Sequence, residues 1–209
     1  MANKHLVMVI DLKRCIGCHT CAVACKSENN LPDGVWWNRV LTVGGESMDT
    51  PEGTFPNVQM QFLTLACQQC ENPACVKVCP VGATYKRDED GVVVQDYDRC
   101  IGCRYCMVAC PYTGVRQFNW KAPQYQLDFP VGDTAVPAHQ ANTVEKCTFC
   151  FHRLAQDKLP ACIEQCPARA RHFGDVNDPD SEVSTLLRER PYFQLLAEKG
   201  TKPSVYFLT

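Results

Sequence analysis

The chain has 209 residues, which is enough for one or two small domains. Its 21 basic and 23 acidic side chains nearly balance, so it lacks the positive surplus of a nucleic-acid-binding protein. We expect no transmembrane helix, because no run of 18 apolar residues occurs, and no export signal in the first ten residues. The composition stands out in one respect, which is its 16 cysteines.

An apolar run over residues 6–10 predicts a short buried strand. The first group of four cysteines follows, with gaps of two, two and three residues: Cys15, Cys18, Cys21 and Cys25. Gly17 lies where a loop around a metal cluster needs a residue without a Cβ. Residues 22–24 predict the start of a helix beside that cluster. No proline follows Cys25, so the helix can continue toward residues 29–30.

Residues 31–60 predict an insertion, because prolines and glycines interrupt them, with one possible strand at 40–43. Trp36 and Trp37 within it fit three roles: anchoring the loop in a core, covering a cluster, or contacting a partner. A strand predicted over 59–66 leads to the second group, with gaps of two, four and three residues: Cys67, Cys70, Cys75 and Cys79.

A β-hairpin is predicted between residues 83 and 94, with its turn at 88–91. The third group then reads C-x2-C-x2-C-x3-C-P, the ligand run of a bacterial ferredoxin: Cys100, Cys103, Cys106 and Cys110. Segments 11–25 and 96–110 share the pattern D-x-x-R-C-I-G-C-x-x-C-x-x-A-C. Such an internal repeat indicates a duplicated ligand-bearing unit.

Residues 112–146 are predicted to be loop-like, and 151–155 to form a helical turn. That turn lies in the wide gap of the fourth group, whose gaps are two, eleven and three residues: Cys147, Cys150, Cys162 and Cys166. Strands are predicted at 168–173 and 205–208. A helix capped by Asp180 or Ser181 is predicted between them.

In a two-cluster ferredoxin, each run gives three ligands to one cluster and its last cysteine to the other. The second and third groups are neighbours and predict one such module, so the first and fourth must pair across it. The hypothesis gives four [4Fe–4S] clusters. Cluster one uses Cys15, Cys18, Cys21 and Cys166; cluster two uses Cys147, Cys150, Cys162 and Cys25; cluster three uses Cys67, Cys70, Cys75 and Cys110; cluster four uses Cys100, Cys103, Cys106 and Cys79.

The predicted fold class is therefore α+β, with two bacterial-type 2[4Fe–4S] ferredoxin-like modules and long loop insertions. Residues 51–116 form the module of clusters three and four. It is inserted into a split module, residues 1–50 and 117–209, that holds clusters one and two. Helix rise and cluster size place the two centres of a module on the order of 10 Å apart, a distance over which electrons can hop.

A disulfide framework or structural zinc fits the cysteines less well than iron–sulfur clusters do. The spacings are metal-ligand spacings that favour a ferredoxin over structural zinc, and nothing marks the chain for secretion. A catalytic iron–sulfur enzyme would need a three-cysteine site with an open iron, which is not apparent, so we expect no catalytic residue here. The five histidines predict surface or packing roles. Arg14 and Arg99, just before two cluster loops, fit either charge compensation or local ion pairs.

The ordered groups resemble the four-cluster iron–sulfur (electron-transfer) subunit of DMSO reductase-family molybdopterin enzymes, over roughly residues 5–185. Segments 147–154 (C-T-F-C-F-H-R-L) and 170–175 (A-R-H-F-G-D) are most similar to the polysulfide and arsenate reductase branch. The resemblance implies a subunit of anaerobic respiration that relays single electrons between a molybdopterin catalytic subunit and a quinol-linked membrane anchor or other redox partner. Clusters one and two would face the catalytic subunit and cluster four the anchor. Membrane association would come through these partners, on the periplasmic or the cytoplasmic side.

Overall fold

The computed structural model describes residues 4–209, so the first three residues of the predicted split module lie outside it. The fold is mixed α/β with few helices, and most of its strands are short. Over residues 4–209, no helix is both long and apolar enough to cross a membrane. The predicted mixture of helices and strands is confirmed.

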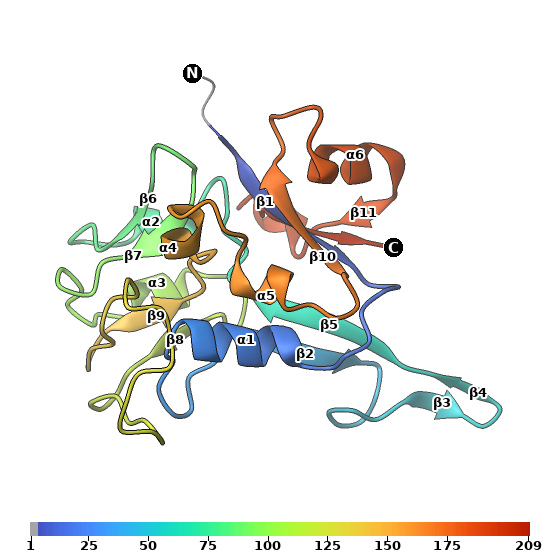
Figure 1. Ribbon diagram of the computed structural model, residues 1–209, viewed down its shortest axis with the longest axis horizontal. Helices are drawn as coiled ribbons and strands as arrows, with labels where there is room; N and C mark the ends of the chain where they lie inside the picture. The colour runs from blue at the N-terminus through green and yellow to red at the C-terminus, as the bar shows by residue number, and fades with distance from the viewer. Residues whose placement is uncertain (1–3) are drawn as a thin grey trace.

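A four-stranded sheet brings the two ends of the chain together (Figure 1). Its central strand β1 (Leu6–Asp11) pairs antiparallel with β10 (Arg171–Asp175) and parallel with β12 (Val205–Leu208), which pairs in turn with β11 (Tyr192–Phe193). Helix α6 (Glu182–Glu189) covers one face, where Val183 is buried against β1. The predicted strands at 6–10 and 205–208 and the Ser181 cap are confirmed, because the Ser181 side chain accepts from Ser184 N–H.

The second structural layer is a ribbon of two strands beside a helix. Helix α1 (Thr20–Glu28) lies against β2 (Asn38–Val43), which pairs antiparallel with β5 (Gln61–Ala66). Beyond them the β3–β4 hairpin (Glu52–Thr54 and Asn57–Gln59) projects from the body of the protein in Figure 1. The sequence predicted β2, β5 and α1, whereas this exposed hairpin was not predicted.

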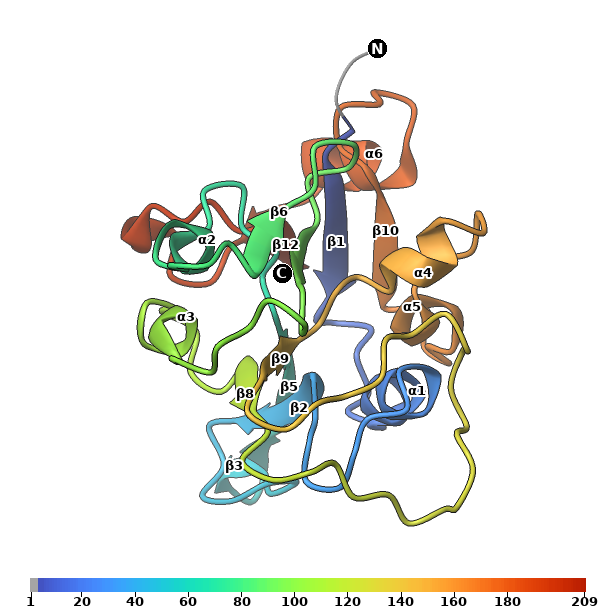
Figure 2. The same ribbon diagram turned by 90° about the vertical axis from the view of Figure 1, so that its left-hand side faces the viewer.

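Short elements carry the rest of the cysteines. The hairpin of β6 (Thr84–Lys86) and β7 (Val93–Gln95) is as predicted. The pair of β8 (Arg116–Phe118) and β9 (Val144–Lys146) lies in residues 112–146, which were wrongly predicted to lack strands. Figure 2 shows α2, α3 and β6 on one side of β1, and α1, α4 and α5 on the other. The short helices are α2 (Ala74–Lys77), α3 (Tyr105–Val108), α4 (Phe151–Leu154) and α5 (Ala161–Glu164), and a 3₁₀ turn lies at Ala197–Lys199.

Cysteines form part of the main hydrophobic core. It joins apolar side chains of β1, β2, β7 and β12 to five buried cysteines: Cys21, Cys25, Cys67, Cys147 and Cys162. Trp37 lies in this core, 3% exposed, which confirms the anchoring role for that residue. Trp36 is half-buried, with the Lys26 ammonium 4.7 Å from its ring centre. The elements therefore pack around the cysteines rather than beside them.

Candidate metal centre

The internal repeat of the sequence is a repeat of backbone conformation. Asp11 accepts hydrogen bonds from the backbone N–H groups two and three residues ahead, at 3.1 and 3.3 Å, and Asp96 does the same at 2.9 and 3.2 Å. Each aspartate thus folds the chain into a turn that delivers the next cysteine. Gly17 and Gly102 both adopt φ +69°, a conformation that favours glycine. The role of Gly17 was predicted from the sequence, whereas that of the aspartates was not.

The first three cysteines of the first group share a cavity with the last cysteine of the fourth. Cys15, Cys18, Cys21 and Cys166 all line it, and the space between atoms is about 350 Å³. Burial raises the pKa of Cys15, and the charges of Cys21 and Cys166 add to the rise. Cys166 Sγ accepts a hydrogen bond from Ala170 N–H at 3.4 Å. This set matches the ligands predicted for cluster one.

A second cavity, about 330 Å³ in the same measure, is lined by Cys25, Cys147, Cys150 and Cys162. Burial, followed by the charges of the other three cysteines, raises the pKa of Cys25 well above its usual range. Asn29 is buried beside them, with its Nδ2 3.7 Å from Cys25 Sγ and 3.9 Å from Cys150 Sγ. The helix α1 therefore presents Cys21 to one cavity and Cys25 to the other.

The remaining eight cysteines divide in the same crossed way. Burial raises the pKa of Cys110 to about 12, and the charges of Cys67 and Cys75 add to that rise. Burial also raises the pKa of Cys70 to about 11, and the charges of the same two cysteines add to that rise. Cys110 thus lies with the second group, although it belongs to the third run in sequence.

Cys79, the last cysteine of the second run, lies instead with the third group. Burial raises the pKa of Cys106, and the charges of Cys75, Cys100 and Cys79 add to the rise. Burial also acts on Cys79, but hydrogen bonds from backbone N–H groups, the strongest from Thr84, lower its pKa. The Thr84 nitrogen is 3.4 Å from Cys79 Sγ.

The four spatial sets of sulfurs, numbered from here on as groups one to four after the predicted clusters one to four, adjoin one another in numerical order. Burial raises the pKa of three cysteines, and in each case the charge of a cysteine from the neighbouring group adds to the rise. The pairs are Cys162 with Cys21, Cys147 with Cys67, and Cys106 with Cys75. At the two ends of this row, Cys18 and Cys103 are exposed at the surface. The groups therefore form a series with an accessible member at each end.

The donor set fits iron–sulfur clusters. Each group offers four sulfurs, which is the ligand number of a [4Fe–4S] cluster, and buried thiols with raised pKa values need a cation before they can ionise together. Backbone N–H groups point at several sulfurs, as in the shells that tune such clusters. The buried histidines have other partners: His139 lies 2.6 Å from Glu145, and His152 lies 3.0 Å from Glu28.

Two arginines that were not predicted from the sequence lie among the cysteines. Arg171 is buried and lines both cavities described above. Arg116 is buried near the third and fourth groups. In contrast, Arg14 and Arg99 are exposed, and Arg99 donates to the Val81 carbonyl at 2.7 Å, which is a local contact. Each arginine begins a short strand whose other residues are only half-buried.

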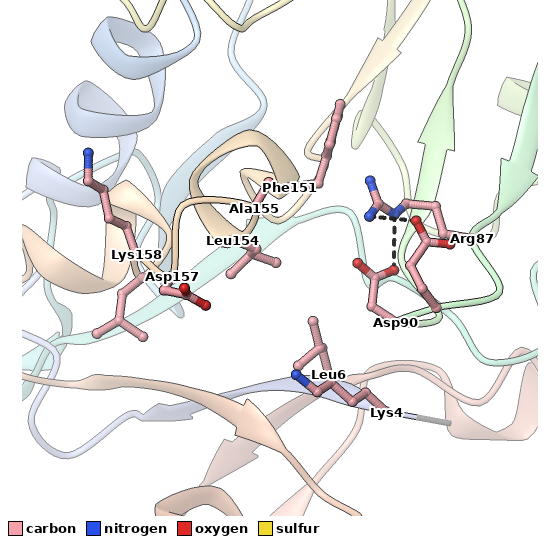
Figure 3. A pocket seen from close by; sticks show the side chains of 11 residues that line it. Lys4, Leu6, Arg87, Asp90, Phe151, Leu154, Ala155, Asp157 and Lys158 are labelled. Atoms are coloured by element: carbon pink, nitrogen blue, oxygen red, sulfur yellow. Dashed lines mark ion pairs between the residues drawn. The ribbon is translucent and has the colours of Figure 1, made fainter. Parts of the chain in front are cut away.

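A further pocket lies away from the cysteines (Figure 3). It is bordered by the start of β1, the turn between β6 and β7, and α4 with the residues that follow it. None of its 11 lining residues is a cysteine. Arg87 on its rim is paired with Asp90 at 3.2 Å and with Glu89 at 2.7 Å. These two acidic groups are thus held by Arg87, and the lining residues include no set of metal ligands.

Comparison with known proteins agrees with the cysteine geometry. Residues 58–126 and 133–176 match the family model of the 4Fe-4S dicluster domain, and residues 6–27 match that of a 4Fe-4S binding domain. A Halobacterium salinarum protein assigned as an iron–sulfur subunit of dimethyl sulfoxide reductase is 53% identical over 96% of this chain and 78% of its own length.

Two further relatives cover nearly the whole chain. The arsenate respiratory reductase iron–sulfur subunit of a Shewanella species is 40% identical over 97% of this chain and 95% of its own length. The iron–sulfur cluster-binding subunit of menaquinone reductase from Nitratidesulfovibrio vulgaris is 41% identical over 97% and 88%. Similarity therefore extends well beyond the cysteine runs.

Proposed function

Because the chain belongs to the family of 4Fe-4S dicluster iron–sulfur subunits of respiratory reductases, we propose that it relays single electrons through four [4Fe–4S] clusters. The relay runs between a molybdopterin-containing catalytic subunit and a quinol-linked membrane anchor or other redox partner. Its relatives are named for dimethyl sulfoxide, arsenate and menaquinone reductases, so the substrate is a property of the catalytic partner.

One observation carries the proposal, which is the crossing of the last cysteine between groups. Cys25 lies with the last three-cysteine set of the chain, and Cys166 lies with the first. This exchange is the ligand pattern of a two-cluster ferredoxin. It supports the assignment of all sixteen ligands given above. It also supports a nested arrangement in which a module of residues 51–116 interrupts a split module of 1–50 and 117–209.

The chain's residues hold the clusters in a series and keep water from its middle. Each bound cluster accepts and gives up one electron. All cysteines of group two are buried and none of group three is exposed, whereas Cys18 and Cys103 are exposed at the two ends. Ile16 and Ile101, beside those ends, are both 62% exposed and are suited to contact a partner. We assign clusters one and two to the side of the catalytic subunit and cluster four to the side of the anchor.

The location follows from these partners. Association with the membrane comes through the anchor subunit, and either side of the membrane is compatible with this chain. The first experiment is isolation of the chain together with the large protein that co-purifies with it, followed by metal analysis of both.

We expect about 16 iron atoms per chain if four all-cysteine cubes are bound, with negligible zinc, and a molybdopterin in the partner. Reduction by a quinol analogue should bleach the visible absorbance of the clusters. Iron near four or eight atoms per chain would contradict the four-cluster relay. Zinc in place of iron would instead identify a structural metal protein.

A further inference from the structure

Arg171 is a buried guanidinium between the first and second cysteine groups. It begins strand β10, and its Nη1 lies 3.4 Å from Cys162 Sγ, while its Nη2 donates to Asn38 Oδ1 at 3.2 Å. Burial would lower the pKa of Arg171, but the charges of Cys162, Cys21 and Cys166 raise it. These three sulfurs come from both groups, so the same positive charge faces two predicted clusters.

Arg116 repeats this placement between the third and fourth groups. It begins strand β8 and is 4% exposed, with one hydrogen bond, of 3.4 Å, from Nη1 to Gln95 Oε1. Within residues 4–209 its buried Nη2 has no hydrogen-bond partner. The pKa of Arg116 would be lowered by burial, but the charges of Cys75, Cys106 and Cys67 raise it. Again the sulfurs belong to both groups of a pair.

A buried guanidinium needs a buried negative charge nearby. An isolated ion in a protein interior carries a large desolvation cost, and arginine cannot shed its proton to avoid it. Carboxylates do not meet this need, because the ion pairs found among residues 4–209 include neither arginine. The thiolates and the clusters that they hold provide the negative charge.

We propose that Arg171 and Arg116 set the reduction potentials of the relay, each acting on the two clusters that flank it. This inference rests on the proposed function. Reduction adds one negative charge to a cluster, so a fixed positive charge stabilises the reduced form and raises the midpoint potential. The same charge lies between two clusters and therefore weakens the repulsion between electrons held by both members of a pair.

The test is an EPR-monitored redox titration of the complex containing Arg171→Gln, Arg116→Gln or the native chain. At a fixed ambient potential, Arg171→Gln should lower the ratio of reduced to oxidised cluster at least tenfold for clusters one and two. That change corresponds to about 59 mV for a one-electron couple. Clusters three and four should change little. Arg116→Gln should show the reverse pattern. Arg171→Lys and Arg116→Lys keep the charge and should restore most of the potential.

Isosteric substitutions beside each arginine give a second measurement that keeps both guanidinium groups in place. Asn38→Asp adds a negative charge beside Arg171 and loses no hydrogen bond, because Asn38 Nδ2 has no partner in the described part of the chain. Gln95→Glu likewise adds a negative charge beside Arg116. We expect each to lower the midpoint potentials of its own pair, including where the glutamine variants fail to retain iron.

The outcomes separate this inference from the relay itself. Iron content and cluster signals of the native complex test the four-cluster proposal, whatever the arginines do. Full iron with unchanged midpoint potentials in the charge variants would overturn the role of the arginines and leave the relay intact. Equal shifts at all four clusters would also overturn it, because the effect would then not be local to a pair.

Discussion

Replacing Cys25 by alanine tests the crossed assignment of ligands most directly. Helix α1 carries both Cys21 and Cys25, one turn apart on the same face, with a rise of about 6 Å between them. The two thiols nevertheless line different cavities, and Cys25 meets sulfurs that follow it by more than 120 positions. Cys25→Ala should therefore damage cluster two and spare cluster one.

The expected loss is one cluster of four, so iron should fall from about 16 to about 12 atoms per chain. The visible absorbance should fall by about a quarter. If three cysteines still hold a three-iron cluster, iron should fall only to about 15, with a new EPR signal. The matched control is Cys21→Ala on the same helix, which should remove the signal of cluster one. Loss of the cluster-one signal in Cys25→Ala would refute the crossed assignment. In the other pair, Cys79→Ser should disturb cluster four rather than cluster three.

Two further predictions concern the backbone that presents the cysteines. Gly34→Ala (φ +76°, in open space) should lower the free energy of unfolding by about 1–2 kcal/mol. Gly17→Ala (φ +69°) should lower it further, because the new Cβ would meet an aromatic ring of β5. Only Gly17→Ala should reduce the iron content. Burial opposes ionisation of Asp11, but Arg190 and two backbone N–H groups lower its pKa. Its stabilising effect is therefore present above about pH 4 and is lost as the pH falls through the lowered pKa. Asp11→Asn should lower the free energy of unfolding by about 1–2 kcal/mol and speed the loss of clusters in denaturant at pH 7. The matched control is Asp96→Asn, because Asp96 makes the same turn without an ion pair, and it should change the rate of cluster loss little.

Much of this fold could be predicted because ligand spacing and local periodicity carry it. Cysteine runs end where a helix or a Cys-Pro turn must begin, and strands such as residues 205–208 are apolar enough to be recognised alone. The β3–β4 hairpin could not be recognised, because its strands are three residues long and fully exposed. No alternation of polar and apolar side chains develops over so short a length.

The pair β8–β9 was missed for a different reason. Its strands read R-Q-F and V-E-K, and residues of that kind normally predict a solvated loop. Here Arg116 and Lys146 face each other in register and both are buried, as is Glu145. Glu145 is paired with His139, and Lys146 donates to the backbone carbonyls of Val93 and Cys147. The contacts of Lys146 with Val93 and of Arg116 with Gln95 reach back to β7, a distant segment that no local pattern can indicate.

The same reasoning explains why the sequence did not point to Arg116 and Arg171. Arg14 and Arg99 immediately precede the cluster loops, so charge compensation was one reasonable role for them, but both are exposed to solvent. Screening by water makes such charges weak partners for a buried site. Arg116 and Arg171 follow a Cys-Pro step by several residues and begin the next strand, which directs them back between two cysteine groups. In a protein whose core itself carries negative charge, a buried arginine is therefore a stronger indication of function than one beside the ligands in sequence.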